Sequence, residues 1–318
     1  MIHSYSLQNG VLTPHSGGLD TALWLDLDSP TLDEEAAVEA VLNCDIPTQA
    51  EMNEIEISSR LYTYDHAIYM TAILPANSDG GDPIMGPVSF VLTPSHLVTI
   101  RYHNPRVFGS FPPRAQATKL EMDSPESCLM ALMEAIIDRQ ADILERAAAE
   151  IDSESRELFK PKQRGTSKDY QKVLEKIGQM GNLNSNIRDS LLTFERLVTY
   201  LGQLLAKRDA SPDMRERART LGSDVKSLTD HANFVASKIT FLLDATLGLI
   251  GIEQNGIFKI FSVVSVIFLP PTLIASTFGM NFTHMPELSW EYGYAYAVGL
   301  MVTFAMLPYL FFKFKKWL

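Results

Sequence analysis

The sequence predicts an α+β membrane protein with a soluble N-terminal α/β domain, a long stalk helix and two C-terminal transmembrane helices. The first indication is a pair of apolar runs, at residues 261–275 and 292–312. With its flanks, each run holds about 20 mostly uncharged residues, roughly what a hydrocarbon layer of ~30 Å requires. The second is a long stretch without a helix breaker that ends at Pro270. The third is a mixture of strand-like and helical segments in residues 1–120.

Residues 1–123 are expected to form the α/β domain. Four short segments in this region are rich in β-branched and aromatic residues and are bounded by Gly, Pro, Asn or Asp, as strands usually are. These segments are residues 22–27, 67–74, 88–92 and 97–102. Residues 33–42 and 49–61 have the apolar spacing of helices, and residues 77–83 have the composition of a loop.

Residues 124–210 are expected to form an antiparallel pair of helices. Ser124 can cap a helix whose first residue is Pro125, which is a favoured way to begin one. The first helix should reach about Phe159. After a break that contains Pro and Gly, the second should occupy roughly residues 167–207.

Residues 211–259 should form the stalk helix, because Ser211 and Pro212 repeat the same start signal. Mostly apolar residues then recur every three or four positions for about four heptads, which predicts packing against other helices. They are Leu221, Val225, Leu228, Ala232, Val235, Ile239, Leu242, Thr246 and Leu249. Continued through the first apolar run, the helix would be on the order of 100 Å long. Such a length suits a stalk that enters a membrane.

The remaining residues divide into a first transmembrane helix at 260–279, a loop at 280–291, a second transmembrane helix at 292–312 and a basic tail at 313–318. Basic residues flank the hairpin only at its two ends: Lys259, Lys313, Lys315 and Lys316. The loop between the helices carries Glu287 and Glu291 and no Lys or Arg. Because positive flanks stay in the cytoplasm, both chain ends and the N-terminal domain are expected there, with the loop in the periplasm.

The charge composition argues against some classes of partner. The formal net charge is −11, and residues 1–256 alone hold 23 basic and 36 acidic residues. This balance argues against a nucleic-acid partner. It suits a surface that gathers cations, or one that is simply soluble. Cys44 and Cys128 form no paired motif and should be buried thiols in a reducing cytosol.

No signal peptide is visible at the N-terminus. The sequence contains no Walker loop, GxGxxG, HExxH or GxSxG motif. We therefore expect neither an enzyme nor an organic cofactor.

One face of the first predicted transmembrane helix carries mostly small or polar side chains. Two helices cannot surround a hole, so a conducting path requires several copies of the chain around an axis, and this face is suited to line it. Its members are Asn255, Ser262, Ser265, Leu269, Thr272 and Ser276. The alternative is that Ser and Thr pack helices together.

Two short motifs lie between the spans: Phe278-Gly-Met-Asn-Phe282 and Met285-Pro-Glu-Leu288. Together with residues 252–255, 259–275 and 313–318, they closely resemble the CorA family of magnesium channels over the last fifth of the chain. The resemblance implies a funnel-shaped homo-pentamer of the inner membrane. It would conduct Mg²⁺ inward, with Co²⁺ and Ni²⁺, and be gated by intracellular Mg²⁺.

The resemblance makes Gly279, Met280 and Asn281 the selectivity filter. Mg²⁺ gives up its water reluctantly, so a ring of neutral oxygens that binds the hydrated ion could select it and still release it. The plainer alternative is that Gly279 and Asn281 only end the helix. The predicted pore lining comprises Asn255, Phe258, Phe261, Ser265, Leu269, Thr272 and Ser276. Phe258 and Phe261 could form an apolar constriction that gates by dewetting.

Charged residues add further expectations. Asp244 lies in an apolar helical run and needs a partner. In the family an acidic residue here can form a ring at the inner mouth; the alternative is an ion pair with Lys238 or with another chain. Glu287 and Glu291 could raise the cation concentration at the outer mouth, or simply be solvated. Asp224, alone or with an Asp of the 79–82 loop, is a candidate regulatory metal ligand.

Two other functions remain open at this stage. A zinc transporter of the same superfamily is the nearer one, although the turn after Gly-Met-Asn is of the magnesium type rather than Gly-rich. A membrane-anchored oligomeric scaffold or sensor is the other, and it would have no use for a polar face on the first span. Two positions depart from the family pattern: Phe278 replaces a usual Tyr, and Ala295 replaces a frequent Pro.

Overall fold

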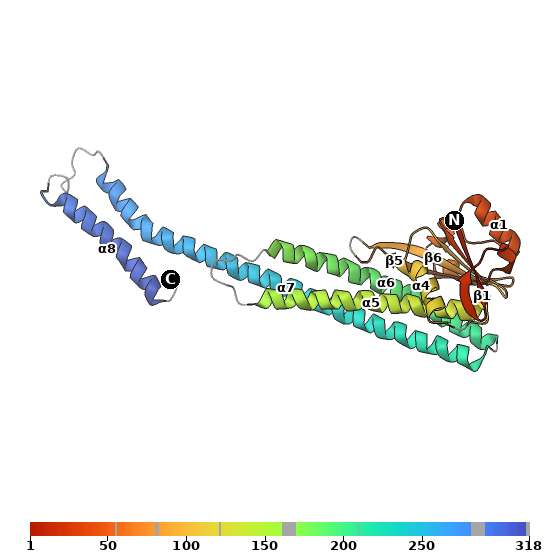
Figure 1. Ribbon diagram of the computed structural model, residues 1–318. Helices are drawn as coiled ribbons and strands as arrows, with labels where there is room; N and C mark the ends of the chain where they lie inside the picture. Colours follow the sequence, from red (N-terminus) through yellow and green to blue (C-terminus); the bar gives the residue numbers. More distant parts are fainter. Residues whose placement is uncertain are drawn as a thin grey trace. The chain divides into compact units, whose positions relative to one another are not determined.

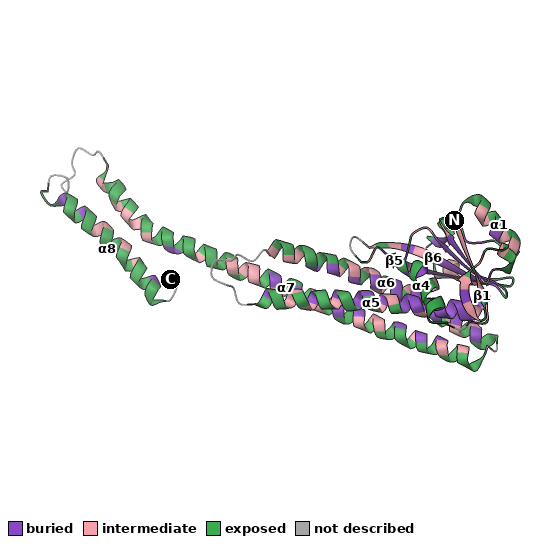
Figure 2. Ribbon diagram, viewed as in Figure 1, coloured by how far each residue is buried: buried purple, intermediate pink, exposed green. Residues whose placement is uncertain are grey.

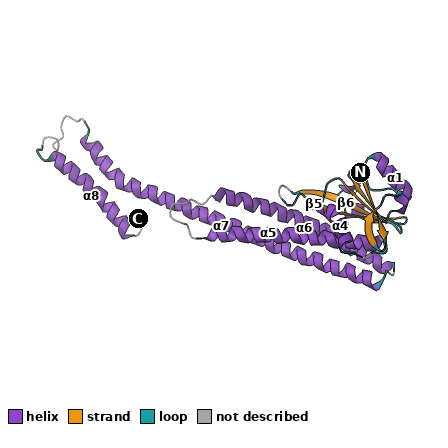
Figure 3. Cartoon of the chain, in the orientation of Figure 1, coloured by secondary structure: helices purple, strands orange, loops and turns teal. Residues whose placement is uncertain are grey.

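The computed structural model describes residues 1–54, 56–79, 83–120, 122–160, 170–208, 210–280 and 290–315. The chain divides into two compact units, Met1–Leu243 and Asp244–Leu318. The first unit contains a β-sheet with helices on it, and the second contains the end of a long helix and one further helix (Figures 1 and 3). The predicted class, an α/β domain followed by a long helix and two apolar helical segments, is confirmed.

The described residues form a seven-stranded mixed sheet in the order β2-β1-β3-β7-β6-β5-β4. The strands are β1 (Ile2–Gln8), β2 (Val11–Pro14), β3 (Trp24–Asp28), β4 (Leu61–Tyr64), β5 (Ala67–Ala76), β6 (Ile84–Leu92) and β7 (Leu97–Arg101). Only β3 and β7 pair in parallel, with Trp24 opposite Leu97. β5 and β6 form a long antiparallel hairpin from Ile68↔Leu92 to Ala76↔Ile84.

Both faces of the central strands are covered. Successive side chains in a strand point to opposite faces, so Phe90 and Leu92 belong to one hydrophobic cluster and Val91 to another. The larger cluster packs against α4 (Arg106–Ala117) and the long helices. The smaller one packs against α1 (Leu32–Leu42), which lies on the opposite face of the sheet (Figure 1).

The N-terminal half differs in detail from the sequence-based expectation. Residues 49–61 do not form one helix: they contain the single-turn helices α2 (Gln49–Met52) and α3 (Ile57–Arg60), and Leu61 already belongs to β4. The cause is local, because a Thr48–Glu51 capping box starts α2 and pairing with β5 draws the following residues into the sheet. β1, β2, β4, α4 and the short 3-10 helix η1 (Leu19–Thr21) were not predicted.

Three long helices follow: α5 (Pro125–Phe159), α6 (Tyr170–Lys207) and α7 (Pro212–Phe278). The predicted caps are present. The backbone N–H of Ser127 donates to Ser124 Oγ at 3.2 Å, and that of Met214 donates to Ser211 Oγ at 3.2 Å. α5 and α6 run antiparallel beside each other (Figure 1).

The apolar seam of α7 is buried within the first unit, as the heptad pattern predicts. Its buried members there are Leu221, Val225, Ala232, Val235 and Leu242. Polar contacts reinforce the packing. Arg217 on α7 makes two hydrogen bonds to Glu134 on α5, at 3.0 and 2.9 Å, and Lys238 Nζ lies 2.7 Å from Asp152 Oδ1. On the α6 side, Asn184 Nδ2 donates to the carbonyl oxygen of Ala232 at 3.1 Å.

β5 is longer than its neighbour β4, and side chains of α6 form hydrogen bonds with the part of β5 that β4 leaves unpaired. β4 pairs with β5 only as far as Met70, so the backbone of Ile73 has no strand on that side. Instead, the Ile73 N–H donates to Thr193 Oγ1 at 3.0 Å, and Ser190 Oγ donates to the Ile73 carbonyl at 2.5 Å. Gln140 of α5 donates in turn to Ser190 Oγ at 2.9 Å. Two helices are thereby hydrogen-bonded to one position of the sheet.

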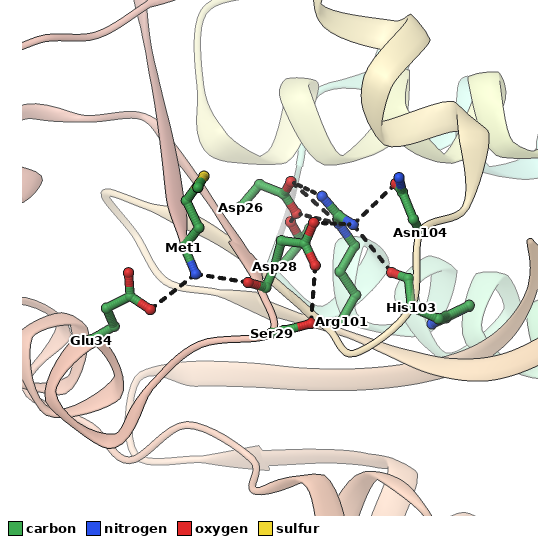
Figure 4. A network of polar contacts seen from close by, with 9 residues as sticks. Met1, Asp26, Asp28, Ser29, Glu34, Arg101, His103 and Asn104 are labelled. Atoms are coloured by element: carbon green, nitrogen blue, oxygen red, sulfur yellow. Dashed lines mark hydrogen bonds and ion pairs between the residues drawn. The ribbon is translucent and has the colours of Figure 1, made fainter.

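A buried ion pair joins the two parallel strands. Arg101 on β7 and Asp26 on β3 are 4% and 2% exposed, and their closest approach is 2.9 Å (Figure 4). Arg101 also lies 3.1 Å from Asp28 Oδ2 and donates to the carbonyl oxygen of His103 at 3.1 Å. Because burying an unpaired charge is costly, this network favours the observed register of β3 and β7.

Candidate functional site

The candidate site lies in the second unit, on α7 from Asn255 to its end at Phe278, on the following residues Gly279 and Met280, and on α8 (Gly293–Phe314). Both helices contain windows long and apolar enough to cross a membrane, with mean hydropathy of 2.1 and 1.8. α7 contains Pro270 and Pro271 and still reaches Phe278. The two prolines lack N–H groups, so they cannot donate to the carbonyls one turn earlier.

The predicted pore-lining face is uncovered in the single chain. All seven of its predicted members are exposed: Asn255, Phe258, Phe261, Ser265, Leu269, Thr272 and Ser276. The buried or half-buried positions of the span lie on a different face, where Val263, Ile267 and Ile274 follow at steps of four and seven. The chain therefore covers one side of this helix and leaves the small and polar side open.

The two membrane helices bury little of themselves (Figure 2). In the most apolar window of each helix, 6% of residues in α7 and 11% in α8 are buried. The fully buried residues of α8 are Gly293, Ala297 and Phe312. In an isolated hairpin the remaining apolar surface would be exposed to water. Because large apolar surfaces are rarely left exposed, lipid or further protein must cover it.

Two threonine hydroxyls near the end of α7 are hydrogen-bonded to their own helix. Thr272 Oγ1 donates to the carbonyl oxygen of Phe268 at 2.8 Å, and Thr277 Oγ1 donates to that of Leu273 at 2.8 Å. Such back-bonding satisfies the hydroxyl proton in an apolar setting. The hydroxyl oxygen keeps lone pairs that can accept a hydrogen bond from water, including the water around a cation.

α7 ends at the first residues of the predicted filter. The Gly279 N–H still donates to the Ala275 carbonyl at 2.9 Å, whereas the Met280 N–H turns to the Thr277 carbonyl at 3.3 Å. A Cβ on Gly279 would lie 3.2 Å from the Ala275 oxygen, so a small residue suits this helix end. Asn281 lies outside the described residues. Its assignment to a filter therefore stays a prediction.

The acidic residues and the tail lysines predicted at the two ends of the membrane helices are exposed wherever the structure describes them. Asp244 is exposed, and Lys238 binds Asp152 in place of the suggested pairing with Asp244. A ring of Asp244 carboxylates at an inner mouth stays a prediction. At the outer end Glu291 is exposed, and Glu287 lies outside the described residues. Of the basic tail, Lys313 and Lys315 are exposed, whereas Lys316 lies beyond the described part of the chain.

Asp224 borders a cavity of about 680 Å³ between α4, α5 and α7. Two of the cavity's other carboxylates are already paired: Glu134 with Arg217, and Asp138 with Arg114 at 3.0 Å. Within the described residues, no group of three or more His, Cys, Asp or Glu side chains is arranged to hold a metal ion. Any metal site that includes Asp224 would therefore need ligands from elsewhere.

Asp79, the described Asp of the 79–82 loop, is engaged by arginine side chains. Its carboxylate binds the guanidinium groups of Arg139 and Arg106, and Arg146 Nη2 lies 2.6 Å from Oδ1. Hydrogen bonds from Arg139 and Arg106 hold the pKa of this carboxyl well below its ordinary value. A cation would have to compete with three arginines. Asp82 lies outside the described residues.

An aromatic cluster at the start of α8 was not among the predicted site residues. The Trp290 ring lies 6.4 Å from that of Tyr292 and 5.5 Å from that of Tyr296, centroid to centroid. The signal was available in the sequence, since Trp and Tyr occupy alternate positions from 290 to 296.

Comparison with known proteins identifies the family. The model of the family described as "CorA-like Mg2+ transporter protein" matches residues 20–316. This chain belongs to the CorA family. The resemblance noted at its C-terminal end is confirmed and extends over nearly the whole length. CorA proteins form a family of transporters and not of enzymes, and the chain is a membrane protein with two C-terminal transmembrane helices.

Similar CorA proteins are found among bacteria. The magnesium transport protein CorA of Haemophilus influenzae (strain ATCC 51907 / DSM 11121 / KW20 / Rd) is 33% identical over 300 residues, which cover 94% of this chain and 93% of that protein. The protein of the same name from Escherichia coli (strain K12) is 32% identical over 325 residues and is aligned over the full length of both chains.

Solved structures share the fold. The complete CorA magnesium transporter of Methanocaldococcus jannaschii superposes with a TM-score of 0.79 at 20% identity, covering 100% of this chain and 99% of that one. The full-length CmaX protein superposes with a TM-score of 0.69 at 15% identity, covering 99% and 97%. The two likenesses show that the CorA architecture extends over the entire chain, membrane helices included.

Proposed function

We propose that this chain is the subunit of a homo-oligomeric, pentameric channel that admits Mg²⁺ across the inner membrane. The observation that carries the proposal is the uncovered small and polar face of α7, from Asn255 to Ser276, beside an otherwise apolar span. A simple anchor would not need this face. Copies arranged around an axis would turn it into the wall of a water-filled path. The magnesium transport proteins that share about a third of its residues support Mg²⁺ as the substrate.

In this proposal Asn281 and the Gly279 carbonyl form a ring that binds the hydrated ion at the outer end. Mg²⁺ dehydrates reluctantly, so accepting hydrogen bonds from its water costs less than stripping the water away. The ring is neutral and so releases the ion inward. Co²⁺ and Ni²⁺ are carried in the same hydrated form. Entry needs no nucleotide, because an inside-negative potential contributes about 2.3 kcal/mol per charge per 100 mV.

We assign gating to two levels below the filter. Phe258 and Phe261, each 67% exposed in the single chain, would form an apolar constriction around the axis. Asp244 would concentrate cations at the inner mouth, and cytoplasmic Mg²⁺ would close the path by binding between neighbouring copies, with Asp224 as one ligand. The N- and C-termini are cytoplasmic in this arrangement, consistent with Lys313 and Lys315 at the end of α8.

The test is uptake into proteoliposomes by purified protein and by the Asn281→Ala and Asn281→Leu variants. Mg²⁺, Co²⁺ and Zn²⁺ compete, and the internal Mg²⁺ concentration is varied. Both variants should abolish Mg²⁺ uptake while the oligomer, checked by native mass measurement, persists. Asn182→Ala, an exposed Asn on α6, is the matched control and should transport normally.

Three results bear on separate parts of the proposal. Unchanged uptake by the Asn281 variants would refute the filter. Preferential uptake of Zn²⁺ would make the protein a zinc transporter. Uptake that does not fall as internal Mg²⁺ rises would remove the regulatory role of Mg²⁺.

A further inference from the structure

Four aromatic side chains mark the outer end of α8. Trp290, Tyr292, Tyr294 and Tyr296 are 52%, 64%, 86% and 48% exposed. Ring contacts of 6.4 and 5.5 Å join Trp290 to Tyr292 and Tyr296, so three of the rings form one cluster with a wide open surface. Large rings left open at this density mark a surface that is covered by something else.

The polar ends of these rings are also open. The three tyrosine hydroxyls and the indole N–H of Trp290 make no hydrogen bond to another described residue. Buried Tyr and Trp usually satisfy these groups, and they gather where one end of the ring is apolar and the other is wet. A partner for this cluster must therefore offer both hydrocarbon contact and hydrogen-bond acceptors.

The rest of α8 indicates which partner does so. Residues 297–308 contain neither Trp nor Tyr, and the next such residue is Tyr309, whose ring centroid lies 6.0 Å from Lys313 Nζ. From Tyr292 to Lys313 the helix rises by roughly 32 Å at 1.5 Å per residue. A hydrocarbon layer of ~30 Å separates the two headgroup regions of a bilayer. The amphipathic side chains are thus spaced to lie at its two boundaries.

The surface between the two boundaries is apolar. Val302, Met306 and Leu310 follow at steps of four on an exposed face and are 58%, 53% and 54% exposed. One continuous surface therefore has aromatic rings at one end, aliphatic side chains in the middle and a lysine over a tyrosine ring at the other. A second copy of the chain would not require this match to bilayer thickness, whereas lipid does.

We infer that Trp290, Tyr292 and Tyr296 form a binding site for phospholipid headgroups at the outer boundary of the membrane. The indole N–H and the phenol hydroxyls donate to phosphate and ester oxygens, while the rings lie against the first carbons of the acyl chains. The site holds the outer end of α8 at a fixed depth. It goes beyond the proposed function, because it would exist in a scaffold as well as in a channel.

The experiment measures the depth of Trp290 in the full chain. The protein is reconstituted in vesicles of phosphatidylcholine and phosphatidylglycerol that contain a nitroxide either on the headgroup or deep in the acyl chain. The Trp317→Phe variant removes one other indole. Trp24 lies in the first unit, is 0% exposed and donates to Thr99 Oγ1 at 3.0 Å, so lipid nitroxides cannot reach it. The Trp290→Phe, Trp317→Phe double variant gives the Trp24 background.

In the Trp317→Phe variant, the headgroup nitroxide should quench tryptophan emission more than the deep nitroxide does. In the double variant, which lacks Trp290, the two nitroxides should quench equally. Stronger quenching by the deep nitroxide would overturn the inference, because the ring would then lie in the hydrocarbon. Quenching no greater than the Trp24 background at either depth would also overturn it, because protein would then cover the ring. Neither outcome bears on Mg²⁺ uptake, so the inference and the proposed function fail separately.

Discussion

Asp79 is a single side chain whose charge fastens the β5–β6 hairpin to two helices. Arg139 and Arg106, with Arg146 nearby, hold the pKa of its carboxyl below the ordinary value. A carboxyl with a lowered folded pKa stabilises the fold above its unfolded pKa of about 3.9, and this stabilisation is lost as the pH falls through the folded pKa. The site is partly exposed, so screening limits the contribution to about 1 kcal/mol.

We therefore expect Asp79→Asn to lower the free energy of unfolding at pH 7 by about 1 kcal/mol and by less at pH 3. Chemical denaturation of the detergent-solubilised protein at both pH values measures the difference. Asp189→Asn, which changes an exposed Asp on α6, serves as the control. An Asp79 effect that is equally large at both pH values would contradict the electrostatic explanation.

At the scale of the element, α7 depends on its buried seam within the first unit. Leu221 is 3% exposed and belongs to the larger hydrophobic cluster. Its truncation leaves a cavity as well as losing apolar burial, so Leu221→Ala should cost about 3 kcal/mol. Leu192→Ala is the matched change on α6, where the side chain is 40% exposed, and should cost much less. Equal shifts in the denaturation midpoint would mean that the seam does not support the fold.

The long helices were predictable because their signals are local and repeated. Ser124 and Ser211 both act as the caps that their Ser-Pro sequences indicate. Of the nine predicted seam residues of α7, six are buried and Leu228, Ile239 and Leu249 are half-buried. The short strands β1, β2 and β4 were not predicted, although tight hairpins pair Gln8 with Val11 and Tyr64 with Ala67. β1 also pairs with β3, which is more distant in the sequence, and α4 is a helix despite Pro112 and Pro113.

The candidate site was predictable in part for the same reason. Helical spacing alone placed Ser265, Thr272 and their neighbours on one face, and that face is exposed. The engagement of Asp79 by three arginines depends on contacts across 27 to 67 residues of chain, which no local pattern reveals. The roles of Asn281 and Asp224 belong to an assembly of several chains, so neither spacing nor a single chain can establish them.

At the scale of the whole molecule, the open face of α7 predicts an assembly that cross-linking can test. Ser265→Cys, in a Cys44→Ser background, should form disulfide-linked dimers on oxidation because copies of this position meet around an axis. Cys128 can stay, since burial raises the pKa of its thiol to about 12 and leaves it unreactive. Met306→Cys, on the exposed face of α8, should not cross-link. Reversed results would place α8 at the axis and refute the proposed pore.

The hydrogen bonds of Ile73 to Thr193 and Ser190 also limit how the first unit can move. Both backbone groups of one strand residue are committed to α6, and α5 is tied to the same place through Gln140. Sliding α6 along the sheet would break both hydrogen bonds of the half-buried Ile73 backbone, at a cost of about 1 kcal/mol for each bond. We therefore expect the sheet, α5 and α6 to move together. In the proposed channel, we predict that movement of this group acts on the stalk through the contacts of α7 with α5 and α6, such as Arg217 with Glu134 and Asn184 with Ala232.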